Sequence, residues 1–158
     1  MRNLNDIIPN AKSFKYKEFV FSNTAIRKGI QNIPTENQWL NIERLASNVL
    51  QPIRNQFGPI RISSGFRSEQ LNISIGGSST SNHCRGEASD FIPIYDISLF
   101  EITEWIYKNL KFRTLIYEFN EWIHIDYRQG GNLNRLKLKD SNHNYKLISL
   151  DYLKMVYR

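Results

Sequence analysis

Residues 81–92 read Ser-Asn-His-Cys-Arg-Gly-Glu-Ala-Ser-Asp-Phe-Ile, a polar loop that runs directly into a short apolar segment. That segment predicts a buried strand over residues 88–92, which the following proline should end because proline has no amide hydrogen for a sheet. His83 therefore lies in the loop, and Asp90 follows seven residues later on the strand. Gly86 allows the chain to reverse between them. An imidazole and a carboxylate could thus converge on one point, as metal binding requires.

A second histidine lies in the later of two expected strands, over residues 113–119 and 121–127. A single residue separates them, which predicts a tight antiparallel hairpin whose turn takes residues from the strand ends. Because side chains alternate along a strand, His124 points away from the isoleucines on either side of it. If those isoleucines face the core, His124 faces a cleft, and Asp126 shares its face.

Helical patterns surround these strands. A capping box at Thr35 and apolar residues three or four apart predict an amphipathic helix over residues 35–57, which Pro52 should kink or shorten. Residues 97–110 predict a second helix, and residues 60–63 a short strand. Two helices packed against a small, largely antiparallel sheet make an α+β domain.

The remaining segments carry weaker signals. Residues 10–34 are expected to be irregular, except that Ser22-Asn23-Thr24 offers a helix cap before residues 25–27. Residues 64–86 are expected to form one long functional loop. The tail over residues 132–158 is basic and aromatic, with a closing strand expected around residues 145–150. No repeat or linker composition appears, so residues 1–158 are expected to form a single domain.

Composition and charge limit the classes of protein. The chain has 158 residues, of which 41% are hydrophobic and 23% charged, and it lacks the apolar run of about 18 residues that a membrane helix needs. These values exclude membrane-spanning, fibrous and disordered classes. The net charge of +6 predicts a surface that attracts polyanions. The single cysteine, Cys84, excludes an internal disulfide.

Two histidines and one carboxylate suit a hydrolytic metal site. They leave a fourth tetrahedral position for water, whereas structural zinc sites are usually richer in cysteine. Taken singly, such residues also serve as ordinary hydrogen-bonding groups, and the pattern alone leaves both roles open. The third histidine, His143, lies in a polar turn and is expected to be exposed to solvent.

Five motifs, in order, resemble those of the M15 zinc peptidases. They are Ser64-Gly65-Phe66-Arg67-Ser68, Leu71-Asn72, Gly76-Gly77-Ser78, the Ser-x-His-x-x-Gly-x-Ala-x-Asp run over residues 81–90, and Trp122-Ile123-His124. The resemblance covers about residues 22–127. It implies the M15 or hedgehog-like peptidase fold, in which a metal site occupies a cleft on the sheet. It also implies the D-Ala-D-Ala carboxypeptidase or L-alanyl-D-glutamate endopeptidase activity that cuts bacterial peptidoglycan peptides.

The resemblance assigns roles to individual residues. It implies that Zn²⁺ is the cofactor and that His83, Asp90 and His124 are its ligands. It places Arg67 beside the scissile carbonyl or a substrate carboxylate, where a planar, permanently charged donor group is useful.

The catalytic acid and base is implied to be Glu121, three residues before the last ligand. An offset of three puts Glu121 and His124 on opposite faces of an ideal strand, so Glu121 can serve only if the chain bends at the hairpin. Glu118 is therefore kept as the reserve base. Asp126 and Ser81 are expected to support the ligands or the substrate from beside the site.

Two other functions remain open at this stage. One is a metal-binding module without activity, although Glu121 and Arg67 are both present. The other is a basic nucleic-acid-binding protein, although no such motif appears. The resemblance also favours a phage or prophage enzyme. Because residues 1–9 lack a signal peptide, we expect synthesis in the cytoplasm, action on the cell wall after release or assisted export, and no membrane insertion.

Overall fold

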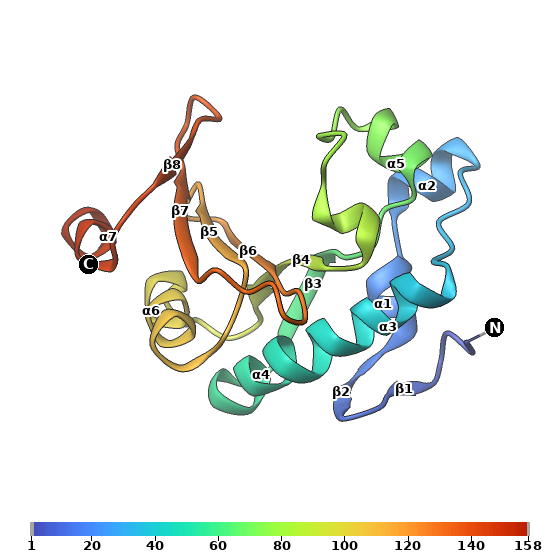
Figure 1. Cartoon of the computed structure of the whole chain (residues 1–158), viewed down its shortest axis with the longest axis horizontal. Helices are drawn as coiled ribbons and strands as arrows, with labels where there is room; N and C mark the ends of the chain where they lie inside the picture. The colour runs from blue at the N-terminus through green and yellow to red at the C-terminus, as the bar shows by residue number, and fades with distance from the viewer. Residues whose placement is uncertain (1, 158) are drawn as a thin grey trace.

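A mixed six-stranded sheet forms the centre of the molecule in the computed structural model, which describes residues 2–157 (Figure 1). Its strands, in spatial order, are β3 (Ile60–Ser64), β4 (Ala88–Pro93), β6 (Trp122–Asp126), β5 (Thr114–Glu118), β7 (Arg135–Lys139) and β8 (Tyr145–Leu147). Every pairing is antiparallel except that of β5 with β7, which is parallel. A separate antiparallel pair joins β1 (Ile7–Ile8) to β2 (Ala11–Lys15). The α+β class with a largely antiparallel sheet is confirmed.

The helices lie around this sheet. They are α1 (Tyr16–Val20), α2 (Asn23–Lys28), α3 (Glu36–Leu45), α4 (Gln51–Phe57), α5 (Glu69–Ser74), α6 (Leu99–Asn109) and α7 (Leu150–Tyr157), with a π-helical turn η1 (Ala46–Leu50) and a 3₁₀ turn η2 (Asn82–Arg85). None of the helices in residues 2–157 combines the length and the apolar character needed to cross a bilayer.

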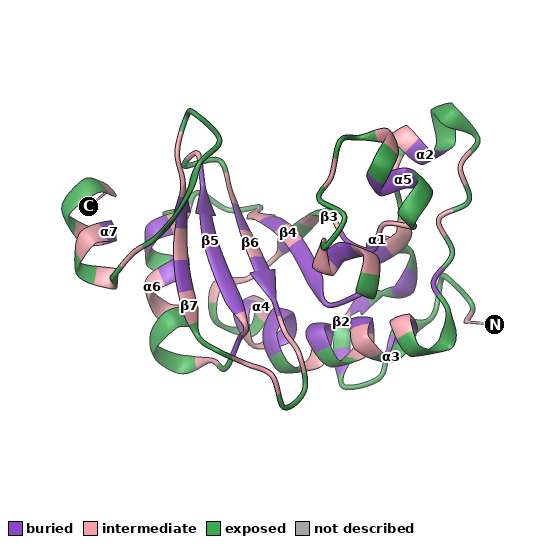
Figure 2. Cartoon of the chain, turned by 45° about the horizontal axis from the view of Figure 1, so that its top comes forward, coloured by how far each residue is buried: buried purple, intermediate pink, exposed green. Residues whose placement is uncertain are grey.

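The two faces of the sheet differ in chemistry. Leu115 and Tyr117 of β5 and Ile123 and Ile125 of β6 are buried in the main core. Figure 2 shows buried residues along β4, β5 and β6. His124 points to the other face, as the alternation predicts. Cross-strand pairing then places Asp90 of β4 directly opposite His124. One face of the sheet therefore builds the core, and the other is free to carry a site.

The predicted long helix forms without a break in direction. Thr35 and Gln38 make the expected capping box, and α3, η1 and α4 follow one another from residue 36 to residue 57. Pro52 lies in the first turn of α4, directly after the wider π-helical turn. The wider turn changes the hydrogen-bond pattern directly before the residue whose amide hydrogen is missing. Pro52 therefore does not end the predicted helix early.

Three segments differ from the sequence-based expectation. Residues 10–34 are not irregular, since they contain β2, α1 and α2. The helix cap expected at Ser22 is confirmed, because its hydroxyl accepts a hydrogen bond from the Ala25 amide at the start of α2. Residues 64–86 are not one loop, since α5 and η2 lie within them. The tail contains β7 and α7, where no strand or helix was predicted, and its predicted strand is limited to β8. Short elements of one or two turns depend on tertiary packing, which local patterns do not report.

Candidate metal centre

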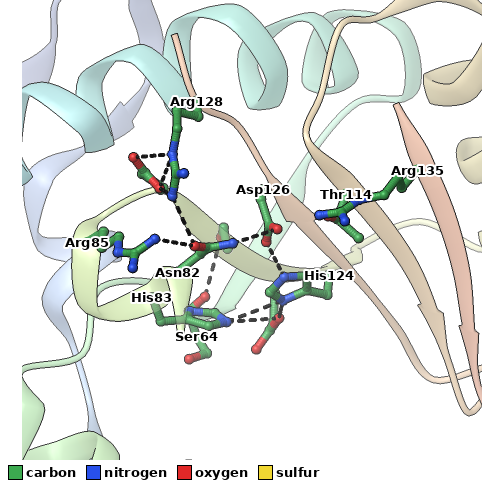
Figure 3. Close-up of polar contacts among 12 residues, drawn as sticks. Ser64, Asn82, His83, Arg85, Thr114, His124, Asp126, Arg128 and Arg135 are labelled. Carbon is green, nitrogen blue, oxygen red and sulfur yellow. Dashed lines mark hydrogen bonds and ion pairs between the residues drawn. The ribbon is translucent and has the colours of Figure 1, made fainter. Parts of the chain in front are cut away.

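Three predicted ligands from three separate elements meet on the polar face of the sheet. His83 comes from η2, Asp90 from β4 and His124 from β6, and one ligand atom of each lies within 4.8 Å of the others. Asp90 Oδ1 is 2.7 Å from His124 Nδ1 and 3.4 Å from His83 Nε2, and the two imidazole nitrogens are 3.3 Å apart. Figure 3 shows the two imidazole rings pointing toward one another. The spacing is close enough for a single metal ion to bridge all three.

The orientation of His83 is fixed by the backbone. Its Nδ1 lies 2.7 Å from the carbonyl oxygen of Gly65, and because a carbonyl only accepts, Nδ1 carries the hydrogen. In the neutral ring Nε2 then holds the lone pair and points at the other two ligands. Gly86 ends η2 with a φ of +71°, and a Cβ there would lie 2.5 Å from the carbonyl oxygen of Gln38. A glycine is therefore required for this turn, which directs His83 toward the sheet.

His124 is oriented by a chain of polar side chains. Its Nε2 contacts Asp126 Oδ1, which leaves Nδ1 to face Asp90. The second oxygen of Asp126 accepts a hydrogen bond of 2.8 Å from the Asn82 amide. Arg128 donates to Asn82 over 3.4 Å and forms an ion pair with Glu87 (Figure 3). The strand period predicted that Asp126 lies beside His124, whereas no sequence signal marked Asn82, Arg128 or Glu87 for this role.

Electrostatics favour a positive charge between the carboxylates. Burial alone would raise the pKa of the Asp90 carboxyl, but the two imidazoles outweigh burial and hold that pKa well below its usual range. Burial would likewise lower the pKa of His124, and the carboxylates of Asp126 and Asp90 instead raise it well above its usual value. The carboxylates that favour a proton on this ring equally favour a divalent cation at the same place.

The three ligands line a cavity of about 490 Å³ whose floor is the polar face of the sheet. Alternate residues of three neighbouring strands form that floor: Thr114, Ile116 and Glu118 of β5, Trp122, His124 and Asp126 of β6, and Arg135, Lys137 and Lys139 of β7. Ser81, expected beside the site, lines the wall. The cavity gives one side of the ligand cluster access to a substrate.

Arg67 reaches this cavity as predicted. Its terminal nitrogen lies 3.8 Å from Asp90 Oδ2. Burial lowers the pKa of its guanidinium, and the nearby Asp90 carboxylate opposes that effect. Among the described residues, Nε of Arg67 is buried without a hydrogen-bond partner. Buried donors without partners are uncommon in proteins, so the folded chain leaves the hydrogen bonding of Arg67 incomplete.

The two candidate bases are placed differently. Glu118 is 5% exposed, lines the cavity and pairs with Lys139 over 3.1 Å. Glu121 is exposed and lines a separate pocket that contains His143, which is also exposed. The reason is the hairpin turn, in which the two residues after Glu118 adopt left-handed φ values of 56° and 57°. The chain turns tightly there, so Glu121 is not brought together with the ligands.

Comparison with known families agrees with this arrangement. A family model described as Peptidase M15 matches residues 12–126, which include the three ligands, Arg67 and Glu118. The chain belongs to the peptidase M15 family. Among the curated proteins, none matches the chain. The M15 match ends at the last residue of β6, so β7, β8 and α7 lie beyond it.

Proposed function

We propose that this M15 family member is a zinc-dependent peptidase that hydrolyses amide bonds in bacterial peptidoglycan peptides. The observation that carries the proposal is the convergence of His83, Asp90 and His124 at one side of an open cavity. Two imidazoles and one carboxylate fit Zn²⁺ and leave a coordination position free. When bound, the metal would polarise the scissile carbonyl and make water more acidic.

Glu118 is the general base in this proposal, in place of Glu121. In the β5–β6 pairing Glu118 lies opposite Trp122 and Ile116 lies opposite His124, so Glu118 and His124 share one face two positions apart. The ion pair with Lys139 holds the carboxylate in position. Glu118 would accept the proton of the attacking water and pass it to the departing amine.

Arg67 would bind the substrate beside the metal. Its guanidinium is fixed near Asp90, and its fork of donors suits either the developing oxyanion or a terminal carboxylate. An oxyanion develops both in cleavage inside a peptide stem and in removal of a terminal D-alanine, whereas a terminal carboxylate beside the scissile bond is present only in the second reaction. We propose both reactions as the candidates for this cavity, and we extend the proposal to an enzyme of phage or prophage type that acts on the wall after release or assisted export. The net charge of +6 would favour binding to anionic wall polymers.

The test is incubation of the zinc-loaded protein, with and without chelator, with defined muropeptides, followed by identification of the products by mass. We expect cleavage that the chelator abolishes. Glu118→Gln should lower kcat by about 10²–10⁴-fold, the usual contribution of a general base. The matched variant Glu121→Gln should leave kcat within about twofold, since that side chain lies outside the cavity.

Two results would contradict parts of the proposal. Intact muropeptides in the presence of stoichiometric Zn²⁺ would reject the peptidase function. Loss of turnover in Glu121→Gln together with full turnover in Glu118→Gln would return the role of base to Glu121.

A further inference from the structure

Three cations line the cavity from a strand beyond the family match. Arg135, Lys137 and Lys139 alternate along β7 and face the cavity, and we call them the basic row. The two leucines between them are buried in the core. Parallel pairing with β5 sets Lys139 beside Glu118 and Lys137 beside Ile116. The basic row is therefore built into the same floor as the metal ligands.

Among residues 2–157, one member of the basic row has a carboxylate partner. Lys139 pairs with Glu118. Arg135 donates a hydrogen bond of 3.3 Å to the hydroxyl of Thr114, which is a neutral partner. Within residues 2–157, the buried Nε of Arg135 has no hydrogen-bond partner. Lys137 forms no ion pair with any residue that the structure describes, and its ammonium lies 6.0 Å from the centre of the Tyr145 ring. Partly buried cations without counter-charges attract an anion more strongly than exposed ones do.

The net charge of the side chains that line the cavity also favours an anionic ligand. Four cationic side chains line it, Arg67 and the basic row, against the three carboxylates of Asp90, Glu118 and Asp126. A divalent ion at the ligands would add two further positive charges. The cavity therefore selects for an anionic ligand.

The position of the basic row sets where that negative charge should lie. The order of strands is β6, β5, β7, and neighbouring strands are about 4.8 Å apart, so β7 lies about 10 Å from the strand that carries His124. An extended peptide covers this span in about three residues, since each adds about 3.4 Å.

We propose that Arg135 and Lys137 form a subsite for a carboxylate of the substrate, about two to three residues from the scissile bond. The preferred substrate is then an acidic peptide with a free carboxylate at that distance. Arg135 offers a planar fork and Lys137 a point charge, so together they suit a single carboxylate. This inference rests on the proposed peptidase function and adds the charge of its substrate.

The experiment compares two muropeptides that are identical except that the acidic residue bears a free carboxylate in one and a carboxamide in the other. Their binding to full-length, zinc-loaded Glu118→Gln protein is measured by calorimetry, so that no turnover is needed. We expect the carboxylate form to bind about tenfold more tightly, as a charge-assisted hydrogen bond would provide. Lys137→Gln and Arg135→Gln, each added to that protein, should reduce the preference to about twofold or less, and Lys137→Arg should retain most of it.

Lys146→Gln is the matched control. Lys146 lies on β8 opposite Leu138, so its side chain shares the leucine face, away from the cavity, and its ammonium lies 4.6 Å from the Tyr152 ring. The control removes the same charge and should keep the full preference. Circular dichroism verifies that each variant is folded. If Arg135→Gln does not fold, the result for Lys137→Gln alone decides whether the subsite exists.

The outcomes separate the subsite from the peptidase function. Equal binding of the two muropeptides, or a preference that persists in Lys137→Gln, overturns the subsite even if the wild type cleaves both. A preference that Lys137→Gln removes and Lys146→Gln keeps supports the subsite, and it does so even where the wild type cleaves neither muropeptide and the peptidase function fails.

Discussion

Replacement of Asp126 by asparagine tests whether the polar chain behind His124 supports metal binding. Asp126 is 3% exposed, and its two oxygens serve two donors, His124 Nε2 and the Asn82 amide. The isosteric amide has only one oxygen. Whichever way it is turned, its NH₂ group faces a donor, and one hydrogen bond is replaced by a buried, unsatisfied contact.

The size of the effect follows from that geometry. An unsatisfied buried donor costs about 1–3 kcal/mol, and the loss of a carboxylate that orients a metal-bound histidine typically weakens metal binding by about 10–100-fold. The two estimates agree, because tenfold corresponds to about 1.4 kcal/mol. Asn82→Ala leaves the Asp126 carboxylate in place and removes one neutral donor to it, worth about 1 kcal/mol, together with the long contacts that Asn82 accepts, so about fivefold weaker binding is expected.

The assay is a titration of metal-free protein with Zn²⁺ in competition with a chromophoric chelator at fixed pH. Asp151→Asn, which changes an exposed carboxylate on α7, is the matched control and should bind zinc as the wild type does. Wild-type affinity in Asp126→Asn would refute the reasoning that Asp126 holds His124 for the metal. Equal losses in Asp126→Asn and Asp151→Asn would show a general charge effect instead.

Three further predictions concern stability. Gly86→Ala should lower the free energy of unfolding in urea by more than Gly130→Ala, because both glycines have a φ near +70° but only at Gly86 does a Cβ meet backbone, 2.5 Å away. The left-handed backbone alone costs an alanine about 1–2 kcal/mol at either position. Equal losses of unfolding free energy in the two variants would contradict the close contact at Gly86. Zn²⁺ at about 100 times its Kd should add about 2.7 kcal/mol, seen as a rise in Tm that chelator reverses; an unchanged Tm would argue against binding to the folded state. Burial and the neighbouring Tyr157 raise the pKa of Tyr117 from 10.0 to about 12, so its contribution to stability is complete below pH 10 and declines as the pH rises toward 12. Tyr117→Phe should flatten that decline in urea unfolding measured against pH, and an unchanged slope would contradict it.

The strand period was sufficient to predict the face on which His124 lies. Ile123 and Ile125 are both completely buried, and a period of two then leaves no alternative for the residue between them. The same period could not choose between the two candidate bases, because the choice depends on where the hairpin turns. The turn uses Phe119 in the left-handed region, where a phenylalanine is rarely found, so no turn signal marks it.

Contacts between distant segments were beyond sequence reasoning for a different reason. Asn82 and Asp126 are 44 residues apart, and Asn82 and Arg128 are 46 apart, so their proximity depends on the register between η2, β4 and β6. Local periodicity reports which face a residue occupies but not which residue lies across from it. The basic row was missed although Arg135-Leu-Lys-Leu-Lys alternates cleanly, since its parallel partner β5 lies well before it in the chain.

Residues 12–126, which the family model matches, do not contain every side chain of the proposed site. Glu118 lies on β5, and β5 is paired on one side by β6, inside the family match, and on the other by β7, beyond it. β7 covers what would otherwise be an unpaired edge of β5, and Lys139 at its end is the ion-pair partner of Glu118. Without Lys139 the carboxylate of Glu118, which is 5% exposed, would lose this ion pair. β7 therefore supplies both the ion-pair partner of the proposed base and the charge of the proposed subsite, and the two depend on the same register between β5 and β7.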